Sequence, residues 1–365
     1  MTEPFLAALR TAAPGLRIST DPLDLEANRR DETSDQQPPL PAAVAWPAST
    51  AETAALVKVA AAHLVPLVPR GAGTSLSGGA LAVEGSLIVN FGRMNRILEI
   101  DEENRVAVVQ PGVVNKALKD AVGARGLWYA PDPASWDTST IGGNIATNAG
   151  GLCCMKYGVT RDSVLSLEVV LADGSVIRTG GRNVKDVAGY DLRALFIGSM
   201  GTLGLVTEAT LHLIPLPPPK QTLIAFFPSI ESAGLAVAGL VRAGVQPATL
   251  ELMDRFTIRA VNRGFDLGLD DEAAAMLLIE SDLAGSAGAL EKQVVDLRAN
   301  IETEAARRAS EPAPVALPCV PQPPVHKAVK KRVPAAKPAA KPSATATPSA
   351  TSPNTTPGTQ PATSH

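Results

Sequence analysis

Apolar residues recur at helical spacing between residues 49 and 64 of the chain. They fit one face of a 3.6-residue repeat and are Leu56, Val57, Ala60, Ala61 and Leu64. Ser49 precedes them, and Glu52 follows it three positions later, which is the spacing of a capping box at a helix N-terminus. The pattern therefore predicts an amphipathic helix that begins at Ser49.

Short apolar runs follow this helix and are typical of β-strands. They cover residues 86–90, 105–109, 165–171, 176–178 and 205–214. The dipeptide Asp173-Gly174 separates two of them and suits a hairpin turn. Short strands with scattered helices indicate an α+β domain over residues 41–216, which a polar leading segment at residues 1–40 precedes.

A proline-rich stretch, Leu216-Pro-Pro-Pro-Lys220, predicts an extended linker and the end of the first domain. Beyond it the pattern predicts a strand at 222–227, a helix at 232–243 and a strand at 276–280. This β-α-β order indicates a second domain within residues 217–310.

The composition changes after residue 310. From Pro312 to the last residue the chain holds 13 of its 31 prolines and no aromatic or acidic residue. Such a segment cannot bury a core, so residues 311–365 are predicted to be a disordered tail. Its six cations, Lys327, Lys330, Lys331, Arg332, Lys337 and Lys341, offset an acidic body, because removing them takes the net charge from −3 to −9. A solvated tail is favoured over a nucleic-acid or lipid contact.

The overall composition is that of a globular protein, with 45% hydrophobic and 19% charged residues among 365. Three cysteines, two of them adjacent, offer no disulfide framework and suit a reducing compartment. No apolar run is long enough to span a bilayer, and the N-terminus shows no signal peptide. These observations predict a cytoplasmic protein.

Residues 69–79 read Pro-Arg-Gly-Ala-Gly-Thr-Ser-Leu-Ser-Gly-Gly, with four glycines in the last nine positions. Glycine-rich backbone can direct several N–H groups at one point and bind an anion, so the run predicts a phosphate-binding loop. It is neither a dinucleotide fingerprint, because Leu76 stands where the third glycine belongs, nor a P-loop, because it lacks Gly-Lys-Ser/Thr. A glycine-rich surface turn is the alternative.

A second low-charge run, at residues 131–158, contains Gly142-Gly143-Asn144 and Asn148-Ala149-Gly150-Gly151. Two long Gly/Asn/Thr segments in one domain suit a large cofactor that the backbone contacts.

Together these runs resemble the FAD-binding domain of the vanillyl-alcohol-oxidase/PCMH-type flavoproteins. Within that family the chain is most similar to the flavin subunit of glycolate oxidase and to FAD-linked D-lactate and 2-hydroxyglutarate dehydrogenases. Further matching segments lie at residues 104–112, 157–162, 185–191 and 198–204. The resemblance implies a two-lobed FAD-binding domain followed by a ferredoxin-like substrate domain, here incomplete.

The resemblance also implies which residues hold FAD. The first loop would wrap the pyrophosphate, and the second run and the strand edge at 201–206 would line the ribityl chain and the isoalloxazine ring. The implied residues are Pro69, Arg70, Gly71, Ala72, Gly73, Thr74, Ser75, Pro131, Asp132, Thr140, Gly142, Gly143, Asn144, Asn148, Gly150, Gly151, Gly201, Gly204 and Val206. One departure is Met200, where the family usually has Glu.

The FAD is expected to be non-covalent, because no histidine lies between His63 and His212 to tether it. A cysteinyl link through Cys153 or Cys154 is a less favoured alternative to two buried thiols acting as small apolar side chains.

Oxidation of a 2-hydroxy acid requires a base and a cation or metal near the flavin. In the resembling family these groups lie in the C-terminal part of the substrate domain, and the pattern of this chain leaves the family near residues 290–310. None of the four histidines fills that role convincingly; they are His63, His212 and the tail residues His326 and His365. No cluster of His, Glu and Asp has metal-ligand spacing. The catalytic residues therefore stay unassigned, and no metal is expected.

Three interpretations follow. The first is an FAD-linked dehydrogenase of glycolate, D-lactate or a similar acid, impaired in this chain. The second is a non-catalytic FAD-binding subunit or scaffold that a partner completes, and the third is a basic-tailed interaction protein with a vestigial flavin fold. The resemblance implies a quinone, a cytochrome or an electron-transfer flavoprotein as acceptor, and a peripheral place at the inner membrane through partners.

Overall fold

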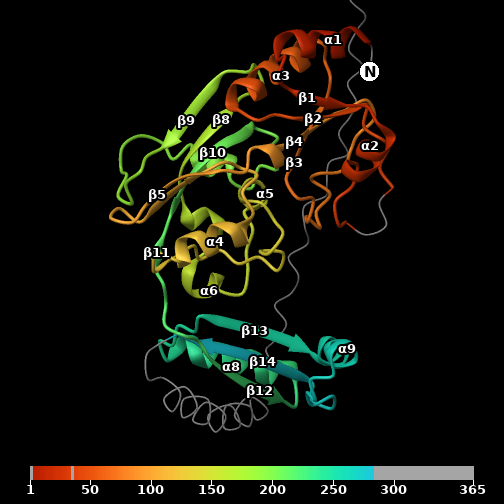
Figure 1. Cartoon of the computed structure of the whole chain (residues 1–365). Helices are drawn as coiled ribbons and strands as arrows, with labels where there is room; N and C mark the ends of the chain where they lie inside the picture. The colour runs from red at the N-terminus through yellow and green to blue at the C-terminus, as the bar shows by residue number, and fades with distance from the viewer. Residues whose placement is uncertain (1–2, 34–36, 283–365) are drawn as a thin grey trace, which may run out of the picture. The chain divides into compact units, whose positions relative to one another are not determined.

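The first layer of the fold is a four-stranded sheet with strand order β1-β2-β4-β3, seen in a computed structural model that describes residues 3–33 and 37–282 (Figure 1). Its strands are β1 (Arg17–Ser19), β2 (Ala43–Trp46), β4 (Leu87–Asn90) and β3 (Leu67–Arg70). β1 is antiparallel to β2, whereas β2 and β3 run parallel to β4. The parallel register brings the end of β3, where the first glycine-rich run begins, to the same edge as the ends of β2 and β4.

Helices α1 (Glu3–Ala12), α2 (Pro22–Asn28) and α3 (Thr50–Ala62) cover this sheet. Phe5 and Leu9 of α1 and Leu56 of α3 are buried with Leu87 of β4 in one hydrophobic cluster. The leading segment that the sequence showed only as polar therefore contributes two helices and a strand, because a few apolar side chains are enough to anchor a short helix to a core.

The second layer is an antiparallel five-stranded sheet with order β5-β6-β10-β8-β9. Its strands are β5 (Ile97–Asp101), β6 (Val106–Val109), β10 (Leu205–His212), β8 (Val164–Val170) and β9 (Val176–Gly180). Helices α4 (Asn115–Gly123) and α5 (Ile141–Thr147) contribute Leu118, Ile141 and Ile145 to the core that β6, β8 and β10 share. Smaller elements are η1 (Phe91–Arg93), β7 (Leu127–Trp128), α6 (Cys154–Tyr157), η2 (Thr160–Ser163), α7 (Arg193–Phe196) and β11 (Ile214–Pro215).

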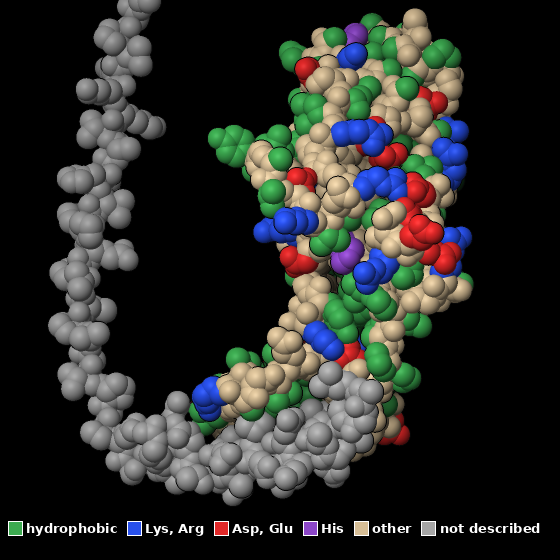
Figure 2. Space-filling model, turned by 90° about the vertical axis from the view of Figure 1, so that its left-hand side faces the viewer, with side chains coloured by type: hydrophobic (Ala, Val, Ile, Leu, Met, Phe, Trp, Pro, Cys, Tyr) green, Lys and Arg blue, Asp and Glu red, His purple; other side chains and the backbone are tan. Residues whose placement is uncertain are grey.

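Charged side chains of opposite sign lie next to one another on one face of this sheet. Arg178 lies 2.6 Å from Glu168 and 2.8 Å from Glu208, and Arg182 lies 2.6 Å from Glu99. Figure 2 shows basic and acidic side chains interspersed across this face. A face of mixed charge presents no basic patch of the kind that nucleic acid requires.

The third layer is a three-stranded antiparallel sheet with order β12-β14-β13. Its elements are β12 (Gln221–Phe227), α8 (Ile230–Arg242), β13 (Thr249–Asp254), α9 (Arg255–Phe265) and β14 (Ala275–Ser281). Ala233, Ala236 and Leu240 of α8 pack with Leu277 and Ile279 of β14, so one face of the sheet is buried under this helix.

The α+β fold class is confirmed, and each strand predicted from the apolar runs overlaps an observed strand. The helix predicted to begin at Ser49 is confirmed as α3, with Ser49 as its N-cap. Its predicted apolar face was wrong at the C-terminal end, because Ala61 is exposed and Leu64 lies beyond the helix with a φ of 54° and is 90% exposed. The domain boundaries stay predictions, and the predicted tail at 311–365 lies outside the described residues.

Candidate cofactor site

A cavity of ≈ 580 Å³ lies where three glycine-rich segments converge, at residues 69–80, 138–150 and 199–206. This volume is in the usual range for a site that binds a small molecule or cofactor. Its walls are mostly Gly, Ala, Ser and Thr, and among the described residues only Glu32 and Arg70 line it with a charged side chain. A cavity with so few charged side chains must recognise a ligand through backbone groups, hydroxyls and shape.

The first wall is the glycine loop, which we define as residues 71–77, directly after β3. The backbone N–H groups of Gly71 to Leu76 donate none of the hydrogen bonds found among the described residues. Gly73 has a φ of 81°, a conformation that side chains rarely adopt, and this residue turns the loop back on itself. Consecutive unpaired N–H groups in such a loop form a concave donor surface for an anion.

The second wall is α5, which the glycine loop approaches closely. Thr140 is its N-cap, and a Cβ atom at Gly71 would overlap the Thr140 hydroxyl. The first N–H groups of α5 are already paired, because those of Ile141 and Gly142 donate to the carbonyls of Val113 (2.8 Å) and Pro111 (2.8 Å). The free donors at this end of the cavity therefore belong to the glycine loop.

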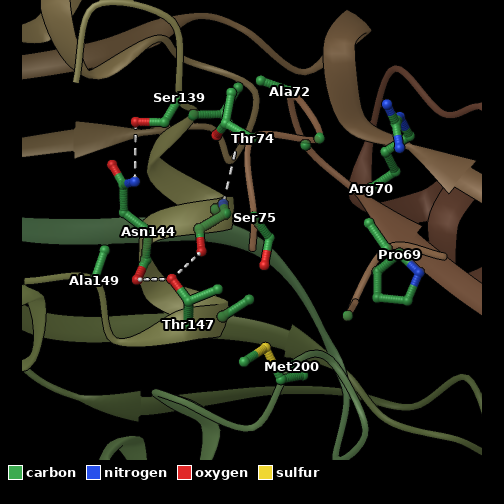
Figure 3. A pocket seen from close by; sticks show the side chains of 18 of the residues that line it. Pro69, Arg70, Ala72, Thr74, Ser75, Ser139, Asn144, Thr147, Ala149 and Met200 are labelled. Atoms are coloured by element: carbon green, nitrogen blue, oxygen red, sulfur yellow. Dashed lines mark hydrogen bonds between the residues drawn. The ribbon is translucent and has the colours of Figure 1, made fainter. Parts of the chain in front are cut away.

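A buried row of hydrogen bonds holds α5 from behind. Asn115 is fully buried in α4 and donates to Asn144 Oδ1 (3.1 Å) and to the carbonyl of Pro131 (3.2 Å). Asn144 donates in turn to Ser139 Oγ (3.1 Å), as Figure 3 shows. Asn144 lines the cavity with its amide already engaged, so its role is to fix α5 and the preceding turn.

The third wall is the turn at residues 199–206, between α7 and β10. Met200 has a φ of 55°, and its N–H donates to the carbonyl of Ala146 (2.9 Å). Gly201 has a φ of 74°, and a Cβ there would overlap the ring of Pro69. The Met200 side chain lies in the cavity wall (Figure 3). The thioether puts an uncharged, polarisable group at the position where the resembling family usually has Glu.

Fifteen of the nineteen residues that the sequence pointed to lie together around this cavity. They are Pro69 to Ser75, Thr140, Gly142, Gly143, Asn144, Gly150, Gly201, Gly204 and Val206. Pro131, Asp132, Asn148 and Gly151 are not in the lining. Asp132 instead accepts a hydrogen bond from the N–H of Cys153 (3.1 Å), and Asn148 ends α5 and accepts one from the N–H of Arg161 (2.9 Å).

Arg70 has a different orientation from the one expected of a phosphate ligand. Its Nη1 donates to the carbonyl of Arg30 (2.7 Å), and Figure 3 shows its side chain pointing away from Asn144 and Thr147. The cavity has nineteen further lining residues that the resemblance did not imply. Most lie in or directly beside the same glycine-rich segments, whereas Glu32, Phe91, Pro111 and Phe196 come from elsewhere in the chain. The nineteen are Glu32, Leu76, Ser77, Gly79, Ala80, Phe91, Pro111, Pro133, Ala134, Ser135, Thr138, Ser139, Ala146, Thr147, Ala149, Phe196, Ser199, Met200 and Leu205.

A second group of polar residues lies next to Asp132, outside the cavity lining. Lys220 Nζ contacts Cys153 Sγ (3.0 Å) and Glu280 (2.9 Å). Burial raises the pKa of the Cys153 thiol, and the carboxyl of Asp132 beside it acts in the same direction. A protonated, buried thiol is a poor nucleophile, which fits a structural role for this cysteine.

Neither of the two described histidines lines the cavity. His63 is the C-cap of α3 and packs edge-on against Phe5, and His212 lies in β10, where burial lowers the pKa of its imidazole. In the part of the chain that the structure describes, no three His, Cys, Asp or Glu side chains gather to form a metal site. No described helix has the length and apolar character needed to cross a membrane.

Comparison with known proteins agrees with this geometry. The family described as FAD binding domain matches residues 41–180, and the family described as FAD linked oxidases, C-terminal domain, matches residues 216–314. In solved structures, p-cresol methylhydroxylase with bound substrate has a similar fold, with a TM-score of 0.64 and 18% identity over 85% of this chain and 65% of that chain. The expected cofactor class, FAD, is thereby confirmed.

Two curated relatives are similar at the sequence level. The glycolate oxidase subunit GlcD of Bacillus subtilis is 50% identical over 251 residues, which cover 69% of this chain and 53% of the relative. The D-2-hydroxyglutarate dehydrogenase of Xanthomonas citri is 41% identical over 261 residues, which cover 72% of this chain and 54% of the relative. The chain thus spans about half the length of these relatives. With both family matches in their expected order, the chain belongs to the FAD-linked oxidases.

Proposed function

We propose that this chain holds FAD non-covalently in the cavity and serves the FAD-dependent oxidation of a 2-hydroxy acid. The observation that supports it is the row of unpaired N–H groups from Gly71 to Leu76, in a cavity with almost no charged lining. Such donors suit the pyrophosphate of FAD, which needs several hydrogen bonds but no nearby base. The substrate class comes from the names of the relatives, glycolate oxidase and D-2-hydroxyglutarate dehydrogenase.

Each wall of the cavity has a distinct role in this proposal. The glycine loop binds the pyrophosphate, with Thr74 and Ser75 as further donors. Thr140, Gly142, Gly143 and Gly150 let the cofactor lie close to the backbone of α5, and the turn at 201–206 covers it from the other side. Bound FAD supplies the acceptor for the hydride that leaves the hydroxyl-bearing carbon of the substrate. The residues of this chain orient it and exclude water.

The described residues place no base beside the segments proposed to line the ring. Glu32 and Arg70 are the only ionisable groups among the described lining residues. The Arg70 side chain is directed away from α5, and Glu32 lies at the glycine loop, where its N–H donates to the carbonyl of Ser75 (3.0 Å) and where the proposal puts the pyrophosphate. The observation favours a second candidate function, that of an FAD-binding subunit whose site another polypeptide completes. The name of GlcD, a subunit of glycolate oxidase, is consistent with an assembly of this kind.

The electron acceptor belongs to the same proposal. A flavin reduced by a 2-hydroxy acid must pass its electrons on, and we infer a quinone, a cytochrome or an electron-transfer flavoprotein as acceptor. The place of reaction would be the cytoplasm, at the inner membrane surface where such acceptors meet the protein through its partners.

The visible spectrum of the purified full chain tests these proposals. Flavin should co-elute with the protein at about one FAD per chain, and trichloroacetic acid should release it if the bond is non-covalent. Glycolate, D-lactate and D-2-hydroxyglutarate are then added without oxygen, with L-lactate as the stereochemical control. Bleaching of the flavin band by glycolate or by a D-acid supports the dehydrogenase, whereas a stable band supports the FAD-binding subunit. A chain that binds no flavin even with added FAD contradicts both.

A further inference from the structure

A short segment before the matched FAD-binding domain contacts the glycine loop at several points. We call residues 29–33 the brace; they follow α2 and precede residue 41, where the family match begins. The N–H of Glu32 donates to the carbonyl of Ser75 (3.0 Å), and the N–H of Ala82 donates to the carbonyl of Arg29 (2.8 Å). The brace thus joins the glycine loop and the chain that leaves it.

Two buried side chains of opposite charge complete this contact. Arg70 is 8% exposed and Asp31 is 6% exposed. Arg70 Nη1 donates to the carbonyl of Arg30 (2.7 Å), and the Asp31 carboxylate accepts from the N–H of Thr33 (3.1 Å) and, at longer range, from the N–H of Ala80 (3.4 Å). Burial lowers the pKa of the Arg70 guanidinium, and the charge of Asp31 counteracts this effect. The charge of Asp31 therefore offsets part of the cost of burying the guanidinium.

The guanidinium supports the loop from the side away from α5. A Cβ atom at Gly73 would overlap it, so the turn of the loop rests directly on the Arg70 side chain. A loop whose N–H groups lack partners gains by rearranging to pair them, and only its surroundings can prevent this. On that side the loop is held by the brace, which includes Asp31, and by Arg70.

We propose that the brace is part of the cofactor site, and that Arg70 and Asp31 are positioning residues that hold the glycine loop in its anion-binding shape before the cofactor arrives. This inference rests on the proposed function for its ligand, FAD. It assigns to Arg70 the role of a support instead of a phosphate ligand. It also extends the site to a segment that the family match does not cover.

Amide hydrogen exchange in the full chain freed of FAD tests the support directly. The reporters are the N–H groups of Glu32 and Ala82, which bond across the contact, with the amides of β14 as a distant reference. In Asp31→Asn and Arg70→Met the two reporters should exchange on the order of tenfold faster while β14 is unchanged, as expected when one buried charge loses its partner. Arg70→Lys keeps the positive charge but loses the planar guanidinium. Its reporters should therefore exchange at rates between those of the other two variants and that of the wild type.

Arg10→Ala is the matched control. Its side chain is exposed and pairs with Glu3 on the surface of α1, outside both the brace and the cavity lining. This variant should therefore leave the reporters and the FAD affinity unchanged, while Asp31→Asn should weaken FAD binding by about tenfold.

Two results would overturn the proposal. If Arg70→Met weakens FAD binding but the reporters exchange as in the wild type, Arg70 is a direct ligand. If Asp31→Asn changes neither measurement, the brace has no part in the site. Because the exchange is measured without cofactor, a wild-type chain that binds no FAD refutes the proposed function and leaves this test intact. If Arg70→Met fails to fold, Asp31→Asn and Arg70→Lys decide the question.

Discussion

Tyr129 is a buried residue whose hydrogen bonding is incomplete. It is 0% exposed in the core of the five-stranded sheet, and its hydroxyl has no partner among the described residues. Burial raises the pKa of its phenol, since an ionised oxygen there would lose its hydration. The ring contributes packing, whereas the hydroxyl costs the desolvation of a polar group that gains nothing in return.

Replacing this hydroxyl should therefore stabilise the protein. Tyr129→Phe keeps the ring and removes the unpaired group, so the free energy of unfolding should rise by about 1 kcal/mol. Urea denaturation followed by circular dichroism measures the change. Tyr190→Phe, at a residue that is 94% exposed, should have no effect. A loss of stability in Tyr129→Phe would mean that the hydroxyl is paired in solution.

Lys119 is a partly buried cation in α4 whose titration should be visible in the stability of the protein. Its Nζ donates to the carbonyl of Tyr129 (2.6 Å) and lies 5.1 Å from the Trp128 ring. Burial lowers its pKa to about 8, and nearby Asp132 opposes this only in part. The folded chain thus releases this proton at lower pH than the unfolded chain, whose lysine keeps a pKa near 10.5.

This difference fixes the sign of the pH dependence. Between about pH 8 and pH 10 the unfolded state holds more protons at Lys119, so its contribution to the free energy of unfolding rises with pH, by up to about 3 kcal/mol. Lys119→Met has no amine to titrate. The free energy of unfolding of the wild type minus that of the variant should therefore increase from pH 8 to pH 10. Urea midpoints from pH 7 to pH 10 measure it. A constant difference would show that the amine stays hydrated.

At the scale of elements, close backbone contact between the three walls shapes the cavity. A Cβ at Gly142 of α5 would lie 2.5 Å from Pro111 Cβ and 3.0 Å from its carbonyl oxygen, so α5 packs against the chain before α4 without room for a side chain. By contrast, a Cβ at Gly123, at the end of α4, meets nothing within 4 Å. The two glycines therefore serve different purposes.

These contacts predict opposite results for two similar substitutions. Gly142→Ala should push α5 away from Pro111, costing about 1–3 kcal/mol of stability and lowering the FAD content of the purified protein. Gly123→Ala should be neutral or slightly stabilising, because alanine favours the helix and nothing obstructs it. Flavin absorbance per chain and the urea midpoint are measured together. Equal FAD content in both variants would contradict the close packing of α5.

The same elements show how far the sequence could predict the fold and the site. Helix α3 and the long strands carry clear apolar periods, and Ser49 marks the helix start, so local patterns were enough. Helix α5 escaped prediction because Ile141-Gly-Gly-Asn-Ile-Ala-Thr147 has poor helix propensity. It forms because Thr140 caps it and two isoleucines are buried in the core. Tertiary contacts thus outweigh propensity here.

In the site, too, local patterns predict some residues and only tertiary contacts place the others. The glycine-rich runs point to the cavity directly, because unpaired backbone donors require this composition. Asp132 and Asn148 lie within such a run but turn toward other loops, and no local pattern specifies that direction. Glu32 and Asp31 come from a polar segment some forty residues before Gly71. Only the folded chain shows that Glu32 contacts the loop at Ser75 and that Asp31 contacts Ala80, just after the loop.

At the scale of the whole described chain, polar contacts join α6 to the end of the three-stranded sheet. Asp282 accepts hydrogen bonds from Lys156 and from the Tyr157 hydroxyl. Its burial alone would raise the pKa of this carboxyl, but the two hydrogen bonds outweigh it and hold the pKa below the usual range. Glu280, bonded to Lys220 and Thr249, also has a lowered pKa despite its burial.

Lowered carboxyl pKa values give these contacts a defined pH range. The stability they contribute is fully present above the unfolded pKa of about 4 and is lost as the pH falls through the lower folded values. The sheet should therefore loosen from α6 in acid before its own core, which Leu277 and Ile279 share with α8, comes apart. At neutral pH, removing the charge of Asp282 should have a similar local effect.

Asp282→Asn makes this local opening measurable through the linker. Lys220 precedes Gln221 at the start of β12, and its amine is engaged by Cys153 and Glu280, so trypsin can cleave there only when the contacts open. Cleavage after Lys220 should be about tenfold faster in the variant, since losing one charged partner costs about 1–3 kcal/mol. Asp120→Asn removes a charge from an exposed pair with Lys116 and should leave the rate unchanged. Equal rates in all three proteins would mean that Asp282 does not hold the sheet against α6, and that the linker alone governs how the two parts move.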